Sequence, residues 1–245
     1  MKIKLLGLSG SPRHGNTDIM VQEALSAAQK LKEVETDFIS LADCKIEGGC
    51  TSTYHCAATP LNKFCVDYRD DVNMILDKIL QADGLIVGVP IYWGGVTAQM
   101  KCVMDRSMCV EFKGFPYRNK AAGALTVGFT RNGGHEPTLT QLHRWFMMHD
   151  MLPVGIGPER GKDGISCYWG PCGLQGFPRS VKLSEDKEGS LEAVKQDLVA
   201  LKDCRLLAKR VVELARVVKL GFENLPAEDL MWAPYGGSEI TFHKD

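Results

Sequence analysis

The sequence predicts a doubly wound α/β fold built on a parallel sheet. Short apolar runs of strand length alternate along the chain with segments of helical periodicity, the pattern of a sheet covered by helices. One run, residues 84–89, is apolar almost throughout, as strands buried on both faces are. With 245 residues, 44% of them apolar, the chain can form a full core. We therefore expect one domain with an insertion or a tail.

The first strand and helix are joined by a polar loop that suits a phosphate group. Residues 2–8 form the strand, and a helical stripe runs over residues 17–32. A helix start attracts anions through its free N–H groups and its dipole. The polar groups that this loop adds belong to Ser9, Ser11, Arg13, Asn16 and Thr17. The loop has neither the Gly-Lys-Ser/Thr ending of an NTPase loop nor the Gly-x-Gly-x-x-Gly of a dinucleotide site. We expect a terminal monophosphate; the alternative is an ordinary turn capped by Asn16 or Thr17.

The remaining elements continue in the same rhythm. We expect strands over residues 36–41, 84–89, 121–128 and 152–155, and helices over residues 71–81, 97–108, 136–149 and 190–219. A Gly- and Pro-rich insertion over residues 156–180 holds Cys167 and Cys172, to which the sequence assigns no role. Residues 221–245 are expected to form an extended tail, which either lies across a neighbouring subunit or is disordered.

Two further loops come directly after strands of the predicted sheet. In open α/β sheets, ligands bind beyond the carboxyl ends of the strands. The first of these loops comprises Pro90, Ile91, Tyr92, Trp93 and Gly94, whose aromatic rings either flank a planar ligand or cap the core. The second comprises Thr130, Arg131, Asn132, Gly133 and Gly134, where the glycines allow close approach to a ligand.

The segment 42–67 lacks periodicity and is rich in cysteine. Four of the nine cysteines in the chain lie in it: Cys44, Cys50, Cys56 and Cys65. An odd total with such local crowding suggests metal or cluster ligation before a disulfide framework. An iron–sulfur cluster needs four thiolates, and zinc accepts the same set, although its usual short spacings are missing here. The remaining alternative is a metal-free loop.

The phosphate loop resembles that of a known family. Leu-Ser-Gly-Ser-Pro-Arg-His-Gly-Asn-Thr, residues 8–17, is similar to the loop of the NAD(P)H-dependent FMN reductase superfamily. The segments Asp105-Arg106-Ser107, Asn119-Lys120, Arg131-Asn132-Gly133-Gly134 and Leu142-His143-x-Trp145 resemble the iron–sulfur flavoproteins within it. The resemblance covers about residues 1–155.

The resemblance implies a flavodoxin-like fold with a five-stranded parallel sheet and helices on both faces. It implies an FMN-binding domain over residues 1–220 with the cysteine-rich loop 42–67, and FMN held by the three loops described above. Phe64-Cys65-Val66 followed by Asp70-Asp71 matches the end of that family's cysteine run. The earlier gaps, of five, five and eight residues, are longer than the family's two-residue gaps. A [4Fe–4S] cluster is expected at Cys44, Cys50, Cys56 and Cys65, with Cys44 as a ligand only if the loop folds back.

The expected function is electron transfer through FMN. The donor would be NAD(P)H or a ferredoxin-like protein and the acceptor is unknown; no catalytic side chain is nominated, because the cofactor carries the chemistry. The alternatives are a non-enzymatic electron carrier, a reductase whose cysteine loop is zinc-bound or metal-free, and a zinc-stabilised interaction protein. The resemblance also implies a homodimer or homotetramer.

Charge and hydropathy exclude other classes. A formal net charge of -1 argues against a nucleic-acid surface. No apolar run approaches the roughly 18 residues needed to cross a bilayer, and the first residues lead into a strand rather than a signal peptide. We therefore expect a cytoplasmic protein with no membrane partner.

Overall fold

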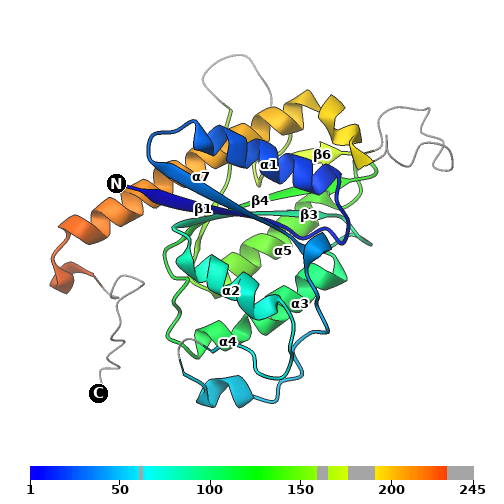
Figure 1. Cartoon of the computed structure of the whole chain (residues 1–245). Helices are drawn as coiled ribbons and strands as arrows, with labels where there is room; N and C mark the ends of the chain where they lie inside the picture. The colour runs from blue at the N-terminus through cyan, green and yellow to red at the C-terminus, as the bar shows by residue number, and fades with distance from the viewer. Residues whose placement is uncertain (61–62, 159–164, 176–190, 231–245) are drawn as a thin grey trace.

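The computed structural model describes residues 1–60, 63–158, 165–175 and 191–230. Parts of the predicted insertion, the expected helix start at residue 190 and most of the predicted tail lie outside these ranges. Within them, the chain forms a central sheet with helices on both faces (Figure 1).

The sheet is parallel, and its strands take the order β2-β1-β3-β4-β5. The strands are β1 (Ile3–Ser9), β2 (Val34–Ser40), β3 (Gly84–Pro90), β4 (Ala121–Gly128), β5 (Leu152–Val154) and β6 (Cys172–Leu174). The predicted five-stranded parallel sheet is confirmed. One strand was not predicted: β6 pairs with the second half of β4, while β5 pairs with the first half. The two short strands thus share the fifth position of the sheet.

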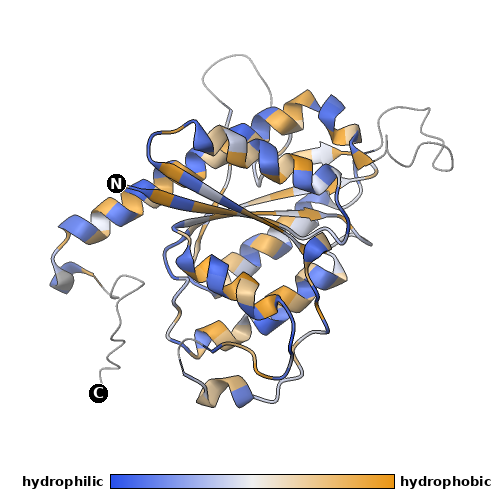
Figure 2. Ribbon diagram, viewed as in Figure 1, coloured by the Kyte–Doolittle hydropathy of each residue, from blue (hydrophilic) through white to orange (hydrophobic). Residues whose placement is uncertain are grey.

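Helices cover the sheet on both sides. The helices are α1 (Asn16–Gln29), α2 (Val72–Gln81), α3 (Ala98–Arg106), α4 (Met108–Glu111), α5 (His135–Met148) and α7 (Leu198–Asn224). One buried cluster joins α1 and α7 to one face, and another joins α2, α3 and α5 to the opposite face. The helices carry their hydrophobic residues mainly toward the sheet (Figure 2). Such a stripe is the amphipathic pattern from which these helices were predicted.

The last helix differs from its prediction at both ends. A short 3-10 turn, Ala193–Gln196, precedes α7, and Asp197 ends that turn. The Asp197 carboxylate accepts a hydrogen bond from the Ala200 N–H at 3.1 Å, which caps the helix. It also accepts one from the Leu174 N–H at 3.1 Å, which ties α7 to β6. At its other end α7 runs to Asn224 and so includes the first residues predicted as a tail.

The carboxyl ends of β1, β3 and β4 meet at one edge of the sheet. Ser9 lies opposite Gly88, and the Gly10 N–H donates to the Gly88 carbonyl at 2.7 Å. The Ile91 N–H donates to the Val127 carbonyl at 2.9 Å. The three predicted ligand loops are therefore neighbours. Among the described residues, no helix is long and apolar enough to cross a membrane.

Candidate functional site

The loop between β1 and α1 is anchored at Gly10. The Thr97 hydroxyl donates to the Gly10 carbonyl at 2.6 Å, which fixes this loop against the start of α3. A methyl group added at Gly10 would lie 2.7 Å from the Val89 side chain and 3.1 Å from that of Met100. Any larger residue at this position would therefore force its neighbours to move. The predicted phosphate loop consequently has a fixed shape.

Ser9 places an unpaired hydroxyl beneath this loop. Its side chain is fully buried, and its Oγ has no hydrogen-bond partner among the described residues. The N-cap residue of the helix beside it, Gly15, has no side chain with which to cap the first N–H groups. Buried polar groups are normally paired, so an orphan at the end of a strand and beside a helix N-terminus marks a place for an acceptor. The residues present therefore fit a phosphate.

The other predicted phosphate residues differ in their hydrogen bonds and exposure. Ser11 closes a turn, since its hydroxyl donates to the Arg13 carbonyl at 2.6 Å. The Asn16 side-chain oxygen accepts from the Val194 N–H at 2.8 Å, which ties the start of α1 to the turn before α7. Thr17 is buried in the first turn of α1, while Arg13 is exposed above the loop. The predicted cap at Asn16 or Thr17 is wrong, because Gly15 occupies the N-cap position.

A carboxylate and a histidine beside this loop were not predicted. Asp18, in the first turn of α1, accepts hydrogen bonds from the Ser40 hydroxyl at 3.2 Å and from His14 at 2.8 Å. The second ring nitrogen of His14 lies 3.0 Å from Asp43. Hydrogen bonds to Asp18 and Asp43 raise the pKa of His14. His14 thus brings positive charge to a site where Asp18 would otherwise disfavour an anion. The sequence could have indicated the His14–Asp18 pair only if the start of α1 at Asn16 had been known.

The loop after β3 presents its two aromatic residues to solvent. Tyr92 and Gly95 exchange two backbone hydrogen bonds, of 2.9 and 3.2 Å, which form a tight turn. Trp93, at its tip, is 105% exposed and has a positive φ of 49°, while Tyr92 is 43% exposed. The alternative in which these rings cap the core is therefore wrong. They stand free at the carboxyl edge of the sheet, and Pro90 and Ile91 form the base of the turn.

The loop after β4 touches the loop after β3. Gly134 has a φ of 105°, and a methyl group added there would lie 2.9 Å from the Cα of Gly94. Gln141 of α5 reaches across as well, because its side-chain oxygen accepts from the Val96 N–H at 3.2 Å. Thr130, Arg131 and Asn132 are exposed above this contact. The structure therefore brings the second and third predicted loops together as one rim.

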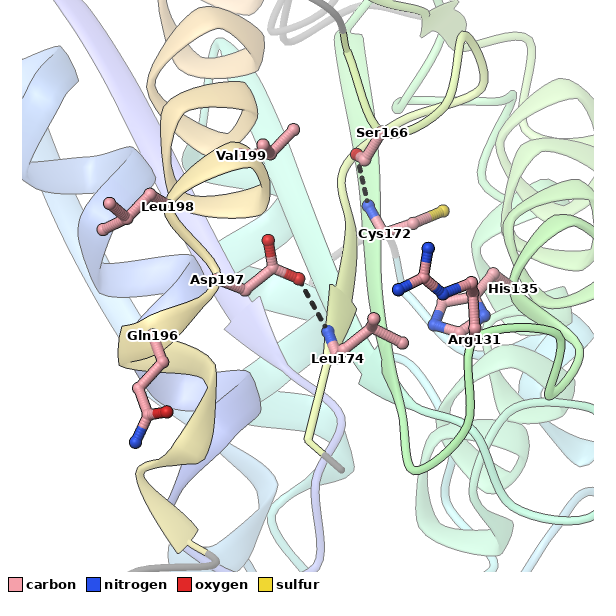
Figure 3. Close-up of a pocket in the computed structure, with 9 residues that line it drawn as sticks. All are labelled: Arg131, His135, Ser166, Cys172, Leu174, Gln196, Asp197, Leu198 and Val199. Carbon is pink, nitrogen blue, oxygen red and sulfur yellow. Dashed lines mark hydrogen bonds between the residues drawn. The ribbon is translucent and has the colours of Figure 1, made fainter. Parts of the chain in front are cut away.

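A cavity of about 490 Å³ opens beside the third loop (Figure 3). Arg131 and His135 line one side of it, while Asp197 and Leu198 line the other. His135 is buried and its Nε2 lies 3.0 Å from the Gly173 carbonyl, so it joins α5 to β6. Sequence analysis missed this cavity, because β6 is a three-residue strand within a segment that has no periodicity.

The four cysteines predicted to hold a metal do not converge. Burial and the neighbouring Cys65 raise the pKa of Cys56, and Cys50 contributes as well. Burial, followed by Asp71 and Asp43, raises the pKa of Cys44 to about 11. Within the part of the chain that the structure describes, no three histidine, cysteine, aspartate or glutamate side chains are placed to hold a metal ion. The residues as positioned therefore do not fit a four-thiolate cluster.

Two buried cations hold the cysteine loop instead. Arg106 forms two hydrogen bonds with Asp70, of 2.5 and 2.8 Å, and lies 4.5 Å from the ring centre of Tyr68. Lys113 donates to the Cys56 carbonyl at 2.9 Å and to the Thr59 hydroxyl at 3.0 Å. Neither role was predicted, since charged side chains are usually solvated. The resemblance around Asp105-Arg106-Ser107 was the one available signal.

Comparison with known proteins identifies the family to which this chain belongs. The NADPH-dependent FMN reductase family model matches residues 3–157, which contain all three loops. The chain belongs to this family. It is a flavin-dependent oxidoreductase, and as such it has an electron donor and an electron acceptor.

Curated relatives and solved structures agree with this assignment. An iron–sulfur flavoprotein of Methanocaldococcus jannaschii is 38% identical over 220 residues, which are 89% of this chain and 100% of the relative. One of Methanosarcina thermophila is 39% identical over 174 residues, or 69% of this chain and 84% of the relative. A WrbA-like flavodoxin structure from Agrobacterium tumefaciens has a TM-score of 0.55 at 18% identity, covering 88% of this chain and 99% of its own. That likeness confirms the flavodoxin-like fold.

Proposed function

We propose that this protein binds FMN by its phosphate at the β1–α1 loop and moves electrons from NAD(P)H or a ferredoxin-like donor to a separate acceptor. The observation that carries the proposal is the buried, unpaired Ser9 hydroxyl beside the uncapped start of α1. A phosphate oxygen is the acceptor that would satisfy both. Thr17 and Arg13 would add donors around it.

The flavin ring would lie against the rim formed by the second and third loops. Tyr92 and Trp93 offer exposed aromatic faces, and Thr130 to Gly134 offer backbone groups at close approach. When bound, FMN accepts a hydride or two single electrons and passes them on. The task of this chain is to hold the phosphate, orient the ring and keep water from one face of it. No side chain of the rim is assigned a proton transfer.

The electron donor is tested by anaerobic reduction of the FMN-loaded protein. If NADH or NADPH bleaches the flavin absorbance and a small acceptor restores it over many turnovers, the protein is a reductase with its own nicotinamide substrate. If only a reduced ferredoxin bleaches it, the protein is an electron carrier between protein partners. Failure of every donor to reduce the bound flavin contradicts the proposed electron transfer.

The iron–sulfur cluster needs a separate test, because the observations that bear on it point in opposite directions. The names of the curated relatives favour a cluster at Cys44, Cys50, Cys56 and Cys65. The placement of the described side chains, no three of which could hold a metal ion together, opposes it. Iron, sulfide, zinc and flavin should be measured on one sample purified without oxygen. About four irons per chain, the content of a cubane cluster, would support the cluster and require the loop to rearrange. Flavin without iron would leave a zinc-bound or metal-free loop.

A further inference from the structure

Two thiols outside the predicted flavin and cluster sites lie next to each other. Cys167 and Cys172 are separated by Tyr168-Trp169-Gly170-Pro171, and their side chains are close enough to interact directly. Both are partly buried against the core cluster of α2, α3 and α5. Neither is in a disulfide in this structure. The pair is thus two adjacent, reduced thiols rather than a structural bridge.

The backbone holds this pair in place at several points. The Gly170 N–H donates to the Cys167 carbonyl at 3.3 Å and closes a turn between the two cysteines. The carbonyls of the intervening residues Tyr168 and Pro171 also accept backbone hydrogen bonds, of 3.1 and 2.9 Å. Gly170 has a φ of 148°, and a methyl group added there would lie 2.1 Å from the Ala124 carbonyl oxygen. The backbone that carries the two cysteines is therefore preorganised.

The cavity described above reaches the pair at Cys172. Cys172 forms part of its wall, between Ser166 and the side chains of Arg131 and His135 (Figure 3). Its volume of about 490 Å³ falls in the usual range of small-molecule sites. The Cys172 N–H donates to the Ser166 hydroxyl at 3.0 Å, and Ser166 is in turn bound to the buried Asp203 at 2.6 Å. The wall that carries the thiol is thus itself fixed.

We propose that Cys167 and Cys172 are a redox-active dithiol that reduces small disulfides entering this cavity. In the first step the Cys167 thiolate attacks a disulfide RSSR, a Cys167–SR bond forms, and one thiolate leaves and takes up a proton. In the second step Cys172 loses its proton and attacks Cys167, so that the Cys167–Cys172 bond forms and the second RSH leaves. Two protein thiols and RSSR thus become one protein disulfide and two RSH.

The environment assigns the two roles. Burial is the main cause that raises the pKa of Cys172, and the neighbouring Cys167, Glu136 and Asp203 raise it further. A thiol that keeps its proton is the slower of two to attack a disulfide. Cys167 is therefore the attacking residue and Cys172 the resolving one. This activity requires no flavin, so it stands or falls apart from the proposed FMN reaction.

The sequence offers a direct readout. Cleavage after lysine and arginine releases residues 163–179 as one peptide, which contains Cys167 and Cys172 and no other cysteine. The reduced full-length protein should be incubated with oxidised glutathione without oxygen, alkylated, digested and analysed by mass spectrometry. The expected product is this peptide lighter by two hydrogens, and dithiothreitol should restore its original mass. A peptide that stays reduced, stops at a glutathione adduct or is joined to another cysteine peptide would overturn the proposal.

Variants separate the two roles. In Cys172→Ser the glutathione adduct at Cys167 should accumulate, whereas Cys167→Ser should form an adduct at Cys172 at least about tenfold more slowly. Cys102→Ser is the matched control, since Cys102 is also partly buried and its neighbouring charges are Asp105, Arg106, Asp70 and Lys101. This control should oxidise as the unmodified protein does. Equal adduct rates in the two test variants would contradict the assignment of roles.

Discussion

Arg106 and Asp70 form a bidentate ion pair in which both side chains are inaccessible to solvent. The pair joins the end of α3 to the residues just beyond the cysteine loop. Asp70 also accepts from the Glu47 N–H at 2.9 Å, so the same carboxylate reaches the other end of that loop. One buried pair thus fixes both ends of a segment that has little regular structure of its own.

Removing one partner of this pair should be costly. Arg106→Met leaves the Asp70 carboxylate buried without its cation, and such losses are about 3 to 5 kcal/mol in the free energy of unfolding. Urea unfolding followed by circular dichroism measures this difference. Lys78→Gln is the control, because its ion pair with Asp37 is exposed and should contribute less than about 1 kcal/mol. An Arg106→Met loss as small as that of the control would show that water already reaches the pair.

Replacement of Ser9 should have different effects on stability and on FMN affinity. In the flavin-free protein, Ser9→Ala removes a buried unpaired polar group, so stability should stay the same or rise. FMN affinity should fall by about 10-fold to 100-fold, the value of one hydrogen bond to a charged group. Riboflavin, which has no phosphate, should bind both proteins equally. An equal loss for both flavins would place Ser9 at the ring rather than at the phosphate.

Gly134 tests the contact between the second and third loops. Gly134→Ala places a methyl group 2.9 Å from the Cα of Gly94 and strains the backbone at a φ of 105°. We expect a stability loss of about 1 to 3 kcal/mol, and weaker binding of FMN and riboflavin alike, because the rim is displaced. Gly157→Ala is the control, since nothing lies within 4 Å of the added methyl group. A loss confined to FMN would contradict the placement of the ring at this rim.

His149 should make the protein less stable in acid. It is buried, its Nε2 lies 2.8 Å from the Ser107 hydroxyl, and burial lowers its pKa from 6.5 to about 4. Between these two values the unfolded chain binds a proton that the folded protein does not, so the free energy of unfolding falls as the pH falls. The effect is on the order of 3 kcal/mol at pH 4, and His149→Gln should remove most of it.

His14 provides the control of opposite sign for this pH dependence. Because its pKa is raised in the folded protein, its contribution is present below pH 6.5 and disappears as the pH rises through the higher folded value. His14→Gln should therefore destabilise the protein in mild acid, and this difference should shrink as the pH rises through the folded pKa of His14. Unfolding curves that shift identically for both variants would falsify these assignments.

Periodicity and chain order were enough to predict the architecture. The parallel sheet, its helices and the three loops at one edge depend on apolar patterns long enough to be recognised, such as residues 84–89 and 121–128. The start of α7 was misplaced, because Asp197 caps it through contacts with β6, and β6 itself is too short to give a pattern. Ser9, Tyr92 and Gly134 were placed correctly at the carboxyl edge of the sheet, although their exposure and pairing could not be predicted.

Long-range polar contacts were beyond sequence analysis. Arg106 and Asp70 are buried together only because α3 packs beside the start of α2, and no local pattern distinguishes them from solvated charges. The cysteines also show that sequence patterns do not fix which side chains meet in the fold. Their crowding in the sequence suggested a shared site, yet among the described residues no three of them are placed to hold a metal ion. Cys167 and Cys172, which had no predicted role, lie next to each other in a different segment.

The central claim is that the β1–α1 loop holds the phosphate of FMN. Calorimetric titration of one flavin-free preparation with FMN and with riboflavin tests it most directly. FMN should bind at least about 100-fold more tightly, because two or more charge-assisted hydrogen bonds depend on the phosphate. Equal affinity for the two flavins would contradict the claim, since it would show that the loop at Ser9 makes no use of the phosphate.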